Sequence, residues 1–129
     1  MIFIYQFDVD GTICNLTTNH EYYKAEPYPE MVEKINKLYD QGHIIKIATA
    51  RGQASGKEFF ELTKKQLEIW GVKYHSLHKK EAAHFYVDDR GMTPDEFILG
   101  KDYDRWEMEK GSLQSAAQSS KPQDGNSSK

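Results

Sequence analysis

The sequence has little cysteine and no long hydrophobic run. Its single cysteine, Cys14, cannot form an internal disulfide, which fits a protein of a reducing compartment. The apolar segment 1–7 is too short to span a membrane and has no basic leader, so we expect it to form a buried strand. These absences predict a cytoplasmic protein without a membrane partner.

The charge balance is weakly acidic, with a formal net charge of -3 at pH 7. No basic stripe follows the chain, which weighs against nucleic acid as a partner. A local cluster of cations could still bind a small phosphorylated metabolite. A zinc site is not expected, because His75 and His78 lack a second pair of histidines or cysteines to complete a ligand set.

Hydrophobic periodicity predicts strands that alternate with helices. The predicted strands are residues 2–7, 43–49, 72–77 and 84–87, and the predicted helices are residues 29–40 and 57–70. Thr93 and Pro94 are typical of another helix start. This alternation predicts a three-layer, Rossmann-like parallel α/β sheet flanked by helices. We expect one domain over residues 1–110 and a disordered polar tail over residues 111–129.

Polar residues gather where the predicted strands end. In chain order they are Asp8, Asp10, Thr49, Ala50, Arg51, Lys79, Lys80, Asp88 and Asp89. Ligands of parallel α/β sheets bind beyond the carboxyl ends of the strands. We therefore expect these residues to converge at one edge of the sheet.

Such a set of residues suits phosphoryl transfer, in which catalysis is mostly positioning and charge neutralisation. A carboxylate that approaches a phosphoryl group with two charges at ~4 Å meets roughly 8 kcal/mol of repulsion at an effective dielectric of ~20. A lysine and a divalent cation can offset this repulsion. Oxygen ligands favour magnesium over zinc as that cation.

The residues then suggest roles in a reaction. Asp8 is expected to attack phosphorus and form an aspartyl-phosphate. Asp10 is expected to protonate the leaving oxygen and later to deprotonate the attacking water. Thr49 would donate its hydroxyl to a phosphoryl oxygen, and Lys80 would neutralise that oxygen and hold Asp8. At the fourth strand end, Asp89 would complete the metal site.

Several assignments remain open from the sequence. Asp88 could hold Lys80 or bind the metal in place of Asp89, and both aspartates could belong only to a helix-capping turn. Lys79 is adjacent to Lys80, and Lys80 is preferred by its distance from Asp88. Arg51 could bind a substrate phosphate or form a surface ion pair, as could Arg90. Thr49 could serve only as a strand residue.

A calcium loop is the other common use of an Asp-x-Asp-Gly string. An EF-hand loop that began at Asp8 would need glycine at its sixth position and glutamate at its twelfth. This chain has Ile13 and Asn19 there. The string therefore does not predict a calcium loop.

The ordered motifs resemble those of the haloacid dehalogenase superfamily over about residues 1–97. The motifs are the string Asp8-Val9-Asp10-Gly11-Thr12, a strand that ends in Thr49, then Lys80, then Asp88-Asp89. In that superfamily the first aspartate is the nucleophile. The second is the acid/base and also gives a backbone carbonyl to magnesium. The resemblance implies a magnesium-dependent phosphatase in which Thr49, Ala50, Arg51 and Lys80 bind substrate and Asp8, Asp10, Asp88 and Asp89 surround the metal.

A narrower resemblance concerns two segments. Thr49-Ala50-Arg51-Gly52 and Tyr86-Val87-Asp88-Asp89-Arg90 are similar to segments of small bacterial capsule-biosynthesis-type phosphatases. That likeness implies a sugar phosphate as substrate; a nucleotide or polynucleotide phosphatase and a non-catalytic phosphate-binding module are the alternatives. Superfamily members often carry a cap domain, but segments 12–44 and 50–79 have no room for a domain of roughly 50 residues. A homo-oligomer could supply a lid from a partner subunit.

Overall fold

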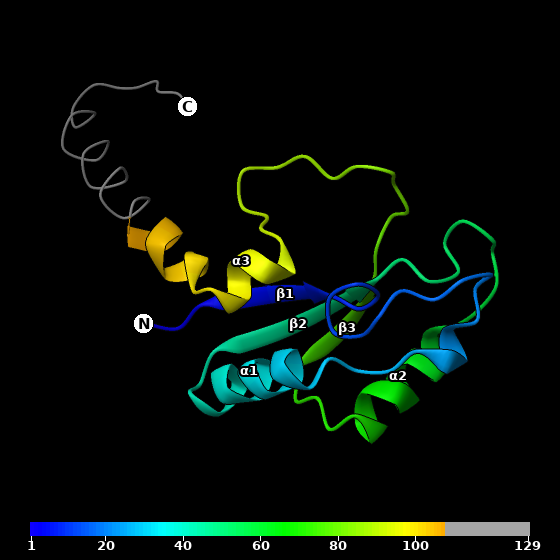
Figure 1. Cartoon of the computed structure of the whole chain (residues 1–129), viewed down its shortest axis with the longest axis horizontal. Helices are drawn as coiled ribbons and strands as arrows, with labels where there is room; N and C mark the ends of the chain where they lie inside the picture. Colours follow the sequence, from blue (N-terminus) through cyan, green and yellow to red (C-terminus); the bar gives the residue numbers. More distant parts are fainter. Residues whose placement is uncertain (108–129) are drawn as a thin grey trace. The chain divides into compact units, whose positions relative to one another are not determined.

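A computed structural model describes residues 1–107 of the chain. The chain divides into two compact units, Met1–Val87 and a second that begins at Asp88. The elements are β1 (Ile4–Asp8), η1 (Tyr22–Lys24), α1 (Pro29–Asp40), β2 (Ile44–Thr49), α2 (Phe60–Ile69), β3 (Ser76–Lys79) and α3 (Pro94–Ile98) (Figure 1). The predicted tail at 111–129 lies outside the described residues, and a single domain over 1–110 stays a prediction.

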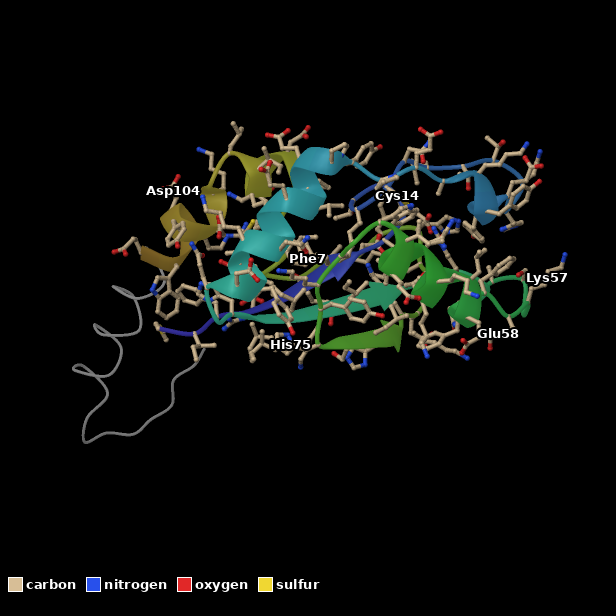
Figure 2. All side chains as sticks on the ribbon, turned by 90° about the horizontal axis from the view of Figure 1, so that it is seen from below. Phe7, Cys14, Lys57, Glu58, His75 and Asp104 are labelled. Atoms are coloured by element: carbon tan, nitrogen blue, oxygen red, sulfur yellow. The ribbon has the colours of Figure 1, made fainter. Side chains whose placement is uncertain are left out.

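The first unit is built on a sheet of three parallel strands in the order β1-β2-β3. Tyr5 pairs with Ile45 and Phe7 with Ile47, and Leu77 pairs with Ile47 from the other side. Both crossovers advance in the same direction across the sheet, so right-handed connections place α1 and α2 on the same face (Figure 2). The prediction of a Rossmann-like parallel α/β sheet flanked by helices is confirmed.

The core of this unit lies between the sheet and the two helices. Ile45 and Ile47 of β2, Ile35 of α1 and Leu67 of α2 are fully buried. Each such side chain contributes about 1.5–3 kcal/mol relative to an exposed position. A one-residue slip of a strand would turn these side chains to the other face. Burial therefore fixes which residues stand at the carboxyl edge of the sheet.

The helix α1 has the predicted bounds, whereas α2 begins later than predicted. Gly42, with a φ of 97°, follows α1 and supplies the left-handed residue that commonly ends a helix. Before α2, the chain forms a loop in which the Gly56 N–H donates to the Gly52 carbonyl at 2.8 Å. The Glu58 carboxylate then accepts from the N–H of Phe60, the first residue of α2, at 2.7 Å. Among residues 1–107, none of the helices has the length and apolarity needed to cross a bilayer.

The prediction of a fourth strand at residues 84–87 is wrong in this structure. These residues form no ladder, and the side chains of Phe85 and Val87 are 85% and 94% exposed. Aromatic and β-branched residues favour a strand only where a neighbouring strand packs against them. No strand of residues 1–107 pairs with this segment. The third predicted strand is also shorter, because pairing starts only at Ser76.

In the second unit, α3 begins as the sequence predicts. The Thr93 hydroxyl accepts from the Glu96 N–H at 3.1 Å, and the Glu96 carboxylate accepts from the Thr93 N–H at 2.8 Å. This reciprocal capping box satisfies two backbone donors at the start of the helix.

Candidate active site

A tight turn after β1 places Asp8 and Asp10 at the carboxyl edge of the sheet. Asp8 pairs in register with Ala48, one residue before Thr49 at the end of β2. The chain then reverses at Gly11, whose φ of 82° lies in the left-handed region that glycine adopts without strain. The Gly11 N–H donates to the Cys14 carbonyl at 2.8 Å and closes the turn.

Lys80 is the lysine that the structure places beside Asp8. Its Nζ lies 4.0 Å from Asp8 Oδ2, and its backbone N–H donates to the Thr49 carbonyl at 2.8 Å. Lys80 Nζ also lies 4.0 Å from the centre of the Tyr86 ring. Lys79 instead forms an ion pair with Glu58, at 3.6 Å. The geometry therefore favours Lys80 over Lys79 as the partner of Asp8.

Burial raises the pKa of the Asp8 carboxyl above its ordinary value of 3.8. The positive charge of Lys80 lowers this pKa, but burial is the larger effect. The Asp8 side chain is 39% exposed, so its carboxylate is less well solvated than a free one but still reaches solvent. A half-buried carboxylate beside a lysine is an environment in which functional carboxylates are often found.

Asp10 is held by Arg51 through two parallel hydrogen bonds. Arg51 Nε donates to Asp10 Oδ2 at 2.9 Å, and Arg51 Nη2 donates to Asp10 Oδ1 at 2.8 Å. Such a bidentate pair fixes the plane of the carboxylate as well as its position. The Arg51 side chain is 0% exposed. The fold therefore places the guanidinium against Asp10, and the role of Arg51 in binding substrate phosphate stays a prediction.

Two polar side chains of α2 accept hydrogen bonds from the Arg51 guanidinium. Arg51 Nη1 donates to Thr63 Oγ1 at 3.1 Å and to Gln66 Oε1 at 2.5 Å. The Tyr22 ring lies over the guanidinium, 4.7 Å from ring centre to Cζ, and the Tyr22 carbonyl accepts from Gln66 Nε2 at 2.7 Å. Sequence reasoning missed Thr63 and Gln66 as site residues. The sequence did indicate a special role for Thr63, because it is a polar residue on the apolar face of the predicted helix.

Thr49 and Ala50 form the turn that follows β2. Thr49 is 2% exposed, and its Oγ1 accepts from the Arg51 N–H at 3.1 Å. An oxygen that already accepts can direct its own hydrogen toward a ligand, as the predicted role of Thr49 requires. The Ala50 carbonyl accepts from the Gln53 N–H at 3.0 Å and closes the turn.

Cys14 lies beside this network without the properties of a nucleophile. Its Sγ donates to Asp10 Oδ1 at 3.5 Å. Burial and the negative charge of Asp10 raise the pKa of the thiol to about 12. The thiolate is the reactive form of cysteine, so Cys14 is inert at neutral pH.

Asp88 and Asp89 belong to the second unit, where they shape a turn. Asp88 Oδ1 accepts from the Arg90 N–H at 2.8 Å and from the Gly91 N–H at 2.5 Å. The Asp89 carbonyl accepts from Arg105 Nη1 at 3.4 Å. Within residues 1–107, no group of three or more His, Cys, Asp or Glu residues is spaced to hold a metal ion. The metal-binding roles of Asp8, Asp10, Asp88 and Asp89 stay predictions.

Gly52 permits the close approach of two backbone segments beside Thr49. A Cβ at Gly52 would lie 1.9 Å from the Lys57 carbonyl oxygen, and the φ of Gly52 is 80°. Gly56 has a similar φ of 77° but open space around its Cα. Gly52→Ala should therefore lower the free energy of unfolding by at least about 1 kcal/mol more than Gly56→Ala does, because only Gly52→Ala adds overpacking to backbone strain.

Urea unfolding of the two glycine variants measures this difference. Since both substitutions impose a positive φ on alanine, Gly56→Ala is the control for strain alone. Equal losses in the two variants would contradict the close approach at Gly52.

The chain belongs to the haloacid dehalogenase-like hydrolases. The sequence pattern of this family matches residues 5–97, which is well over half of the chain. The matched segment contains each of the site residues predicted from the sequence. A comparison with curated proteins gives no match.

Several solved structures are similar to this chain at low sequence identity. A crystal structure of a Vibrio cholerae protein is 24% identical, with a TM-score of 0.72 over 84% of this chain and 99% of that chain. A chain of a Pnkp1/Rnl/Hen1 complex is 17% identical, with a TM-score of 0.50 over 76% of this chain and 34% of that chain. A D,D-heptose bisphosphate phosphatase from B. bronchiseptica, complexed with magnesium and phosphate, is 14% identical. Its TM-score is 0.49 over 82% of this chain and 64% of that chain.

Proposed function

We propose that this hydrolase is a magnesium-dependent phosphatase that cleaves a phosphate monoester through an aspartyl-phosphate on Asp8. One observation carries the proposal: Asp8 and Lys80 lie 4.0 Å apart at the sheet edge where Arg51 holds Asp10. A nucleophile, a cation and an acid/base thus stand together. We propose a small phosphorylated metabolite as the substrate.

The reaction has two steps. In the first, an oxygen of Asp8 forms a bond to phosphorus while the bond from phosphorus to the leaving oxygen breaks, and Asp10 gives its proton to that oxygen. In the second, a water oxygen attacks phosphorus and loses a proton to Asp10, the bond from phosphorus to Asp8 breaks, and inorganic phosphate leaves. Both Asp10 oxygens accept from Arg51 here, and each oxygen keeps a second lone pair that can carry the transferred proton.

The residues present fit a magnesium ion by the chemistry of their donors. Magnesium prefers oxygen ligands and neutralises charge on phosphoryl oxygens. Asp8 would offer its carboxylate. The family resemblance implies that Asp10 would offer its backbone carbonyl, which leaves its carboxylate to Arg51. Asp88 and Asp89 are the candidates for the remaining carboxylate ligand.

Removal of the metal should lower the rate of aryl phosphate hydrolysis by at least ~100-fold, since a bound metal supplies several kcal/mol of charge stabilisation. The assay compares protein treated with a chelator and the same protein after magnesium is restored. Acid quenching followed by mass spectrometry should find a phosphoryl group on Asp8. An unchanged rate after chelation, with no modified Asp8, would exclude the proposal.

A non-catalytic phosphate-binding module is the second candidate. The observation in its favour is that Lys80 and Thr49 lie at the same sheet edge, where their ammonium and hydroxyl can donate to a phosphate whether or not that phosphate is cleaved. Such a module would bind inorganic phosphate by calorimetry and turn over no substrate of a broad panel. The same panel, with nucleotides included, tests a nucleotide phosphatase.

A further inference from the structure

The loop between β1 and α1 contains a short turn over residues 18–25, which we call the η1 turn. The Tyr22 carbonyl accepts from the Ala25 N–H at 3.0 Å and closes its helical part. Tyr22 lies 44 positions before Gln66 in the chain, yet Figure 1 and Figure 2 both show the blue η1 beside the green α2. The phosphatase reaction proposed above assigns no task to the η1 turn.

The Gln66 amide joins the η1 turn to Arg51. Its Oε1 accepts from Arg51 Nη1 at 2.5 Å, and its Nε2 donates to the Tyr22 carbonyl at 2.7 Å. The opposite orientation of the amide would set its NH₂ against a guanidinium and its oxygen against a carbonyl, and neither contact is a hydrogen bond. Gln66 is 7% exposed, so the loss of either partner would leave a buried polar group unsatisfied. This position therefore requires a side chain that accepts at one atom and donates at the other.

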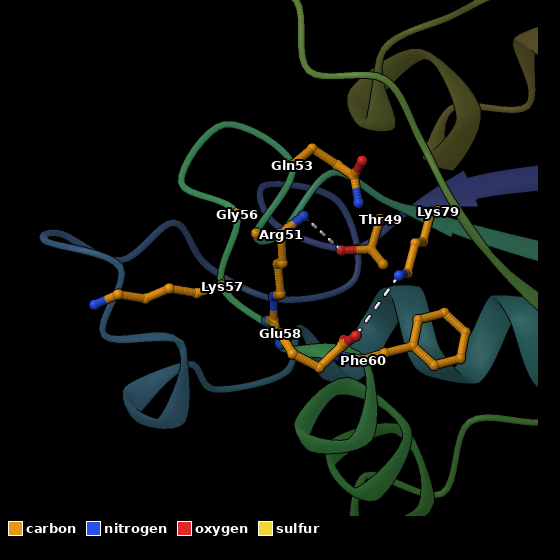
Figure 3. A pocket seen from close by; sticks show the side chains of 9 residues that line it. Thr49, Arg51, Gln53, Gly56, Lys57, Glu58, Phe60 and Lys79 are labelled. Carbon is orange, nitrogen blue, oxygen red and sulfur yellow. Dashed lines mark hydrogen bonds and ion pairs between the residues drawn. The ribbon is translucent and has the colours of Figure 1, made fainter.

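The Arg51 guanidinium has a partner for each of its five N–H groups. Nε and Nη2 donate to Asp10, Nη1 donates to Thr63 and Gln66, and Nη2 also donates to Cys14 Sγ at 3.7 Å. Figure 3 shows the Arg51 side chain extending from the loop that follows β2. A rotation of the guanidinium would break its hydrogen bonds to α2 and to Asp10 together. A shift of Gln66 is therefore transmitted to Asp10.

The Tyr22 ring covers the face of the same guanidinium. The ring centre lies 4.7 Å from Arg51 Cζ, which is within the range of a cation–π contact. The Phe59 ring meets the Tyr22 ring edge-on, with centroids 4.8 Å apart and an interplanar angle of 81°. The Tyr22 hydroxyl points to a different partner, since it lies 3.3 Å from the exposed His20 Nδ1. The ring and the carbonyl of Tyr22, rather than its hydroxyl, thus contact the network around Arg51.

We propose that Tyr22 and Gln66 are positioning residues for the acid/base, since they hold Arg51 and Arg51 holds Asp10 in the geometry that both proton transfers need. The inference rests on the proposed phosphatase function. A displacement of a reacting group by about 1 Å can cost roughly 100-fold in rate. The η1 turn can therefore control kcat although neither Tyr22 nor Gln66 takes part in a proton transfer.

Tyr22→Leu should lower kcat for nitrophenyl phosphate about tenfold and leave KM within about twofold, because it displaces Asp10 without removing a phosphate ligand. Tyr22→Phe keeps the ring over Arg51, so its kcat should stay within about twofold of the wild-type value. Tyr23→Leu is the matched control, because Tyr23 is the next residue of η1 and is 65% exposed. It should leave kcat and KM unchanged.

The aspartyl-phosphate gives a second measurement. Nitrophenolate leaves readily as an anion without a proton from Asp10, whereas the attacking water must still lose a proton to Asp10. The phosphoryl group on Asp8 should therefore accumulate during turnover in Tyr22→Leu, and acid quenching followed by mass spectrometry measures it. A variant that is merely less stable would lose activity without accumulating this intermediate.

Gln66→Glu tests the link between Arg51 and the η1 turn. Glutamate keeps an oxygen for Arg51, but its carboxylate has no hydrogen to donate to the Tyr22 carbonyl. The substitution should lower kcat about tenfold as well. In the double variant with Tyr22→Leu, the loss should be smaller than the product of the two single losses, because both substitutions act through Arg51.

The inference is overturned if Tyr22→Leu keeps the wild-type kcat or accumulates no phosphoryl group on Asp8, or if Tyr23→Leu loses as much kcat. Single losses that multiply in the double variant would also overturn it, because they would show independent roles. If Gln66→Glu does not fold, the comparison of the Tyr22 variants decides. If the wild type hydrolyses no phosphate ester with magnesium present, the proposed function itself fails, and the inference fails with it.

Discussion

Asp8→Asn should lower kcat for phosphate monoesters by at least ~10³-fold and should also stabilise the folded protein. The loss of activity follows from removal of the attacking oxygen, since loss of a nucleophile typically costs a hydrolase several orders of magnitude. The gain in stability follows from burial. Burial raises the Asp8 pKa, and the ionised carboxylate is therefore the form that the fold disfavours at neutral pH.

The stability effect has a defined dependence on pH. A carboxyl whose pKa is raised in the folded state destabilises the protein as pH rises from the ordinary value of 3.8 through the folded value. The difference in Tm between Asp8→Asn and the wild type should therefore be small below that window and reach its full size above it. Activity should decrease as pH falls, because protonation of Asp8 removes the nucleophile.

Thermal unfolding and phosphate release, each followed from acid to neutral pH, measure both effects. Asp40→Asn is the control, because Asp40 is an exposed carboxylate that pairs with Lys73 at 2.9 Å and lies outside the site. It should change neither kcat nor Tm appreciably. A wild-type rate in Asp8→Asn would remove Asp8 from the mechanism.

Arg51→Met should destabilise the protein by about 3 kcal/mol, because it leaves the carboxylate of Asp10 without its buried partner. The same substitution also leaves Gln66 Oε1 without its donor from Arg51. Urea unfolding at neutral pH measures this loss. A loss below about 1 kcal/mol would contradict the buried network.

Arg51→Lys separates a positioning role from a substrate-binding role. Lysine keeps the charge but cannot make two parallel hydrogen bonds to one carboxylate. If Arg51 acts through Asp10, kcat for an aryl phosphate should fall about 100-fold while KM stays within about threefold. If Arg51 binds the substrate phosphate, KM should rise instead. The split between kcat and KM therefore distinguishes a positioning role of Arg51 from a role in binding substrate phosphate.

The sequence predicted the parts of the fold that depend on local periodicity. Met31, Ile35 and Leu38 repeat at helical spacing, and all three are buried in α1 as expected. Strand ends are also local features, so the approach of Asp8 and Lys80 followed from their order along a parallel sheet. The segment 84–87 has the composition of a strand but forms none, because a strand also needs a partner.

The residues that hold the site could not be assigned in the same way. Arg51 reaches Asp10, Thr63 and Gln66 across 41, 12 and 15 positions of the chain. Which acceptors it finds depends on how α2 packs, and no local pattern encodes that. Lys79 is the last residue of β3 and Lys80 is the first residue after it. The two lysines are of one type and adjacent, so the sequence could not show that Lys79 pairs with Glu58 and Lys80 with Asp8.

The arrangement of Arg51 and the loop that follows it has a consequence for protein engineering. Arg51, which holds Asp10, lies before the loop, and Thr63 and Gln66, which hold Arg51, lie after it in α2. The intervening residues 53–58 are exposed and contribute no side chain to that network. This stretch can therefore be exchanged, with Gly52 kept, while the hydrogen bonds that hold Asp10 stay in place.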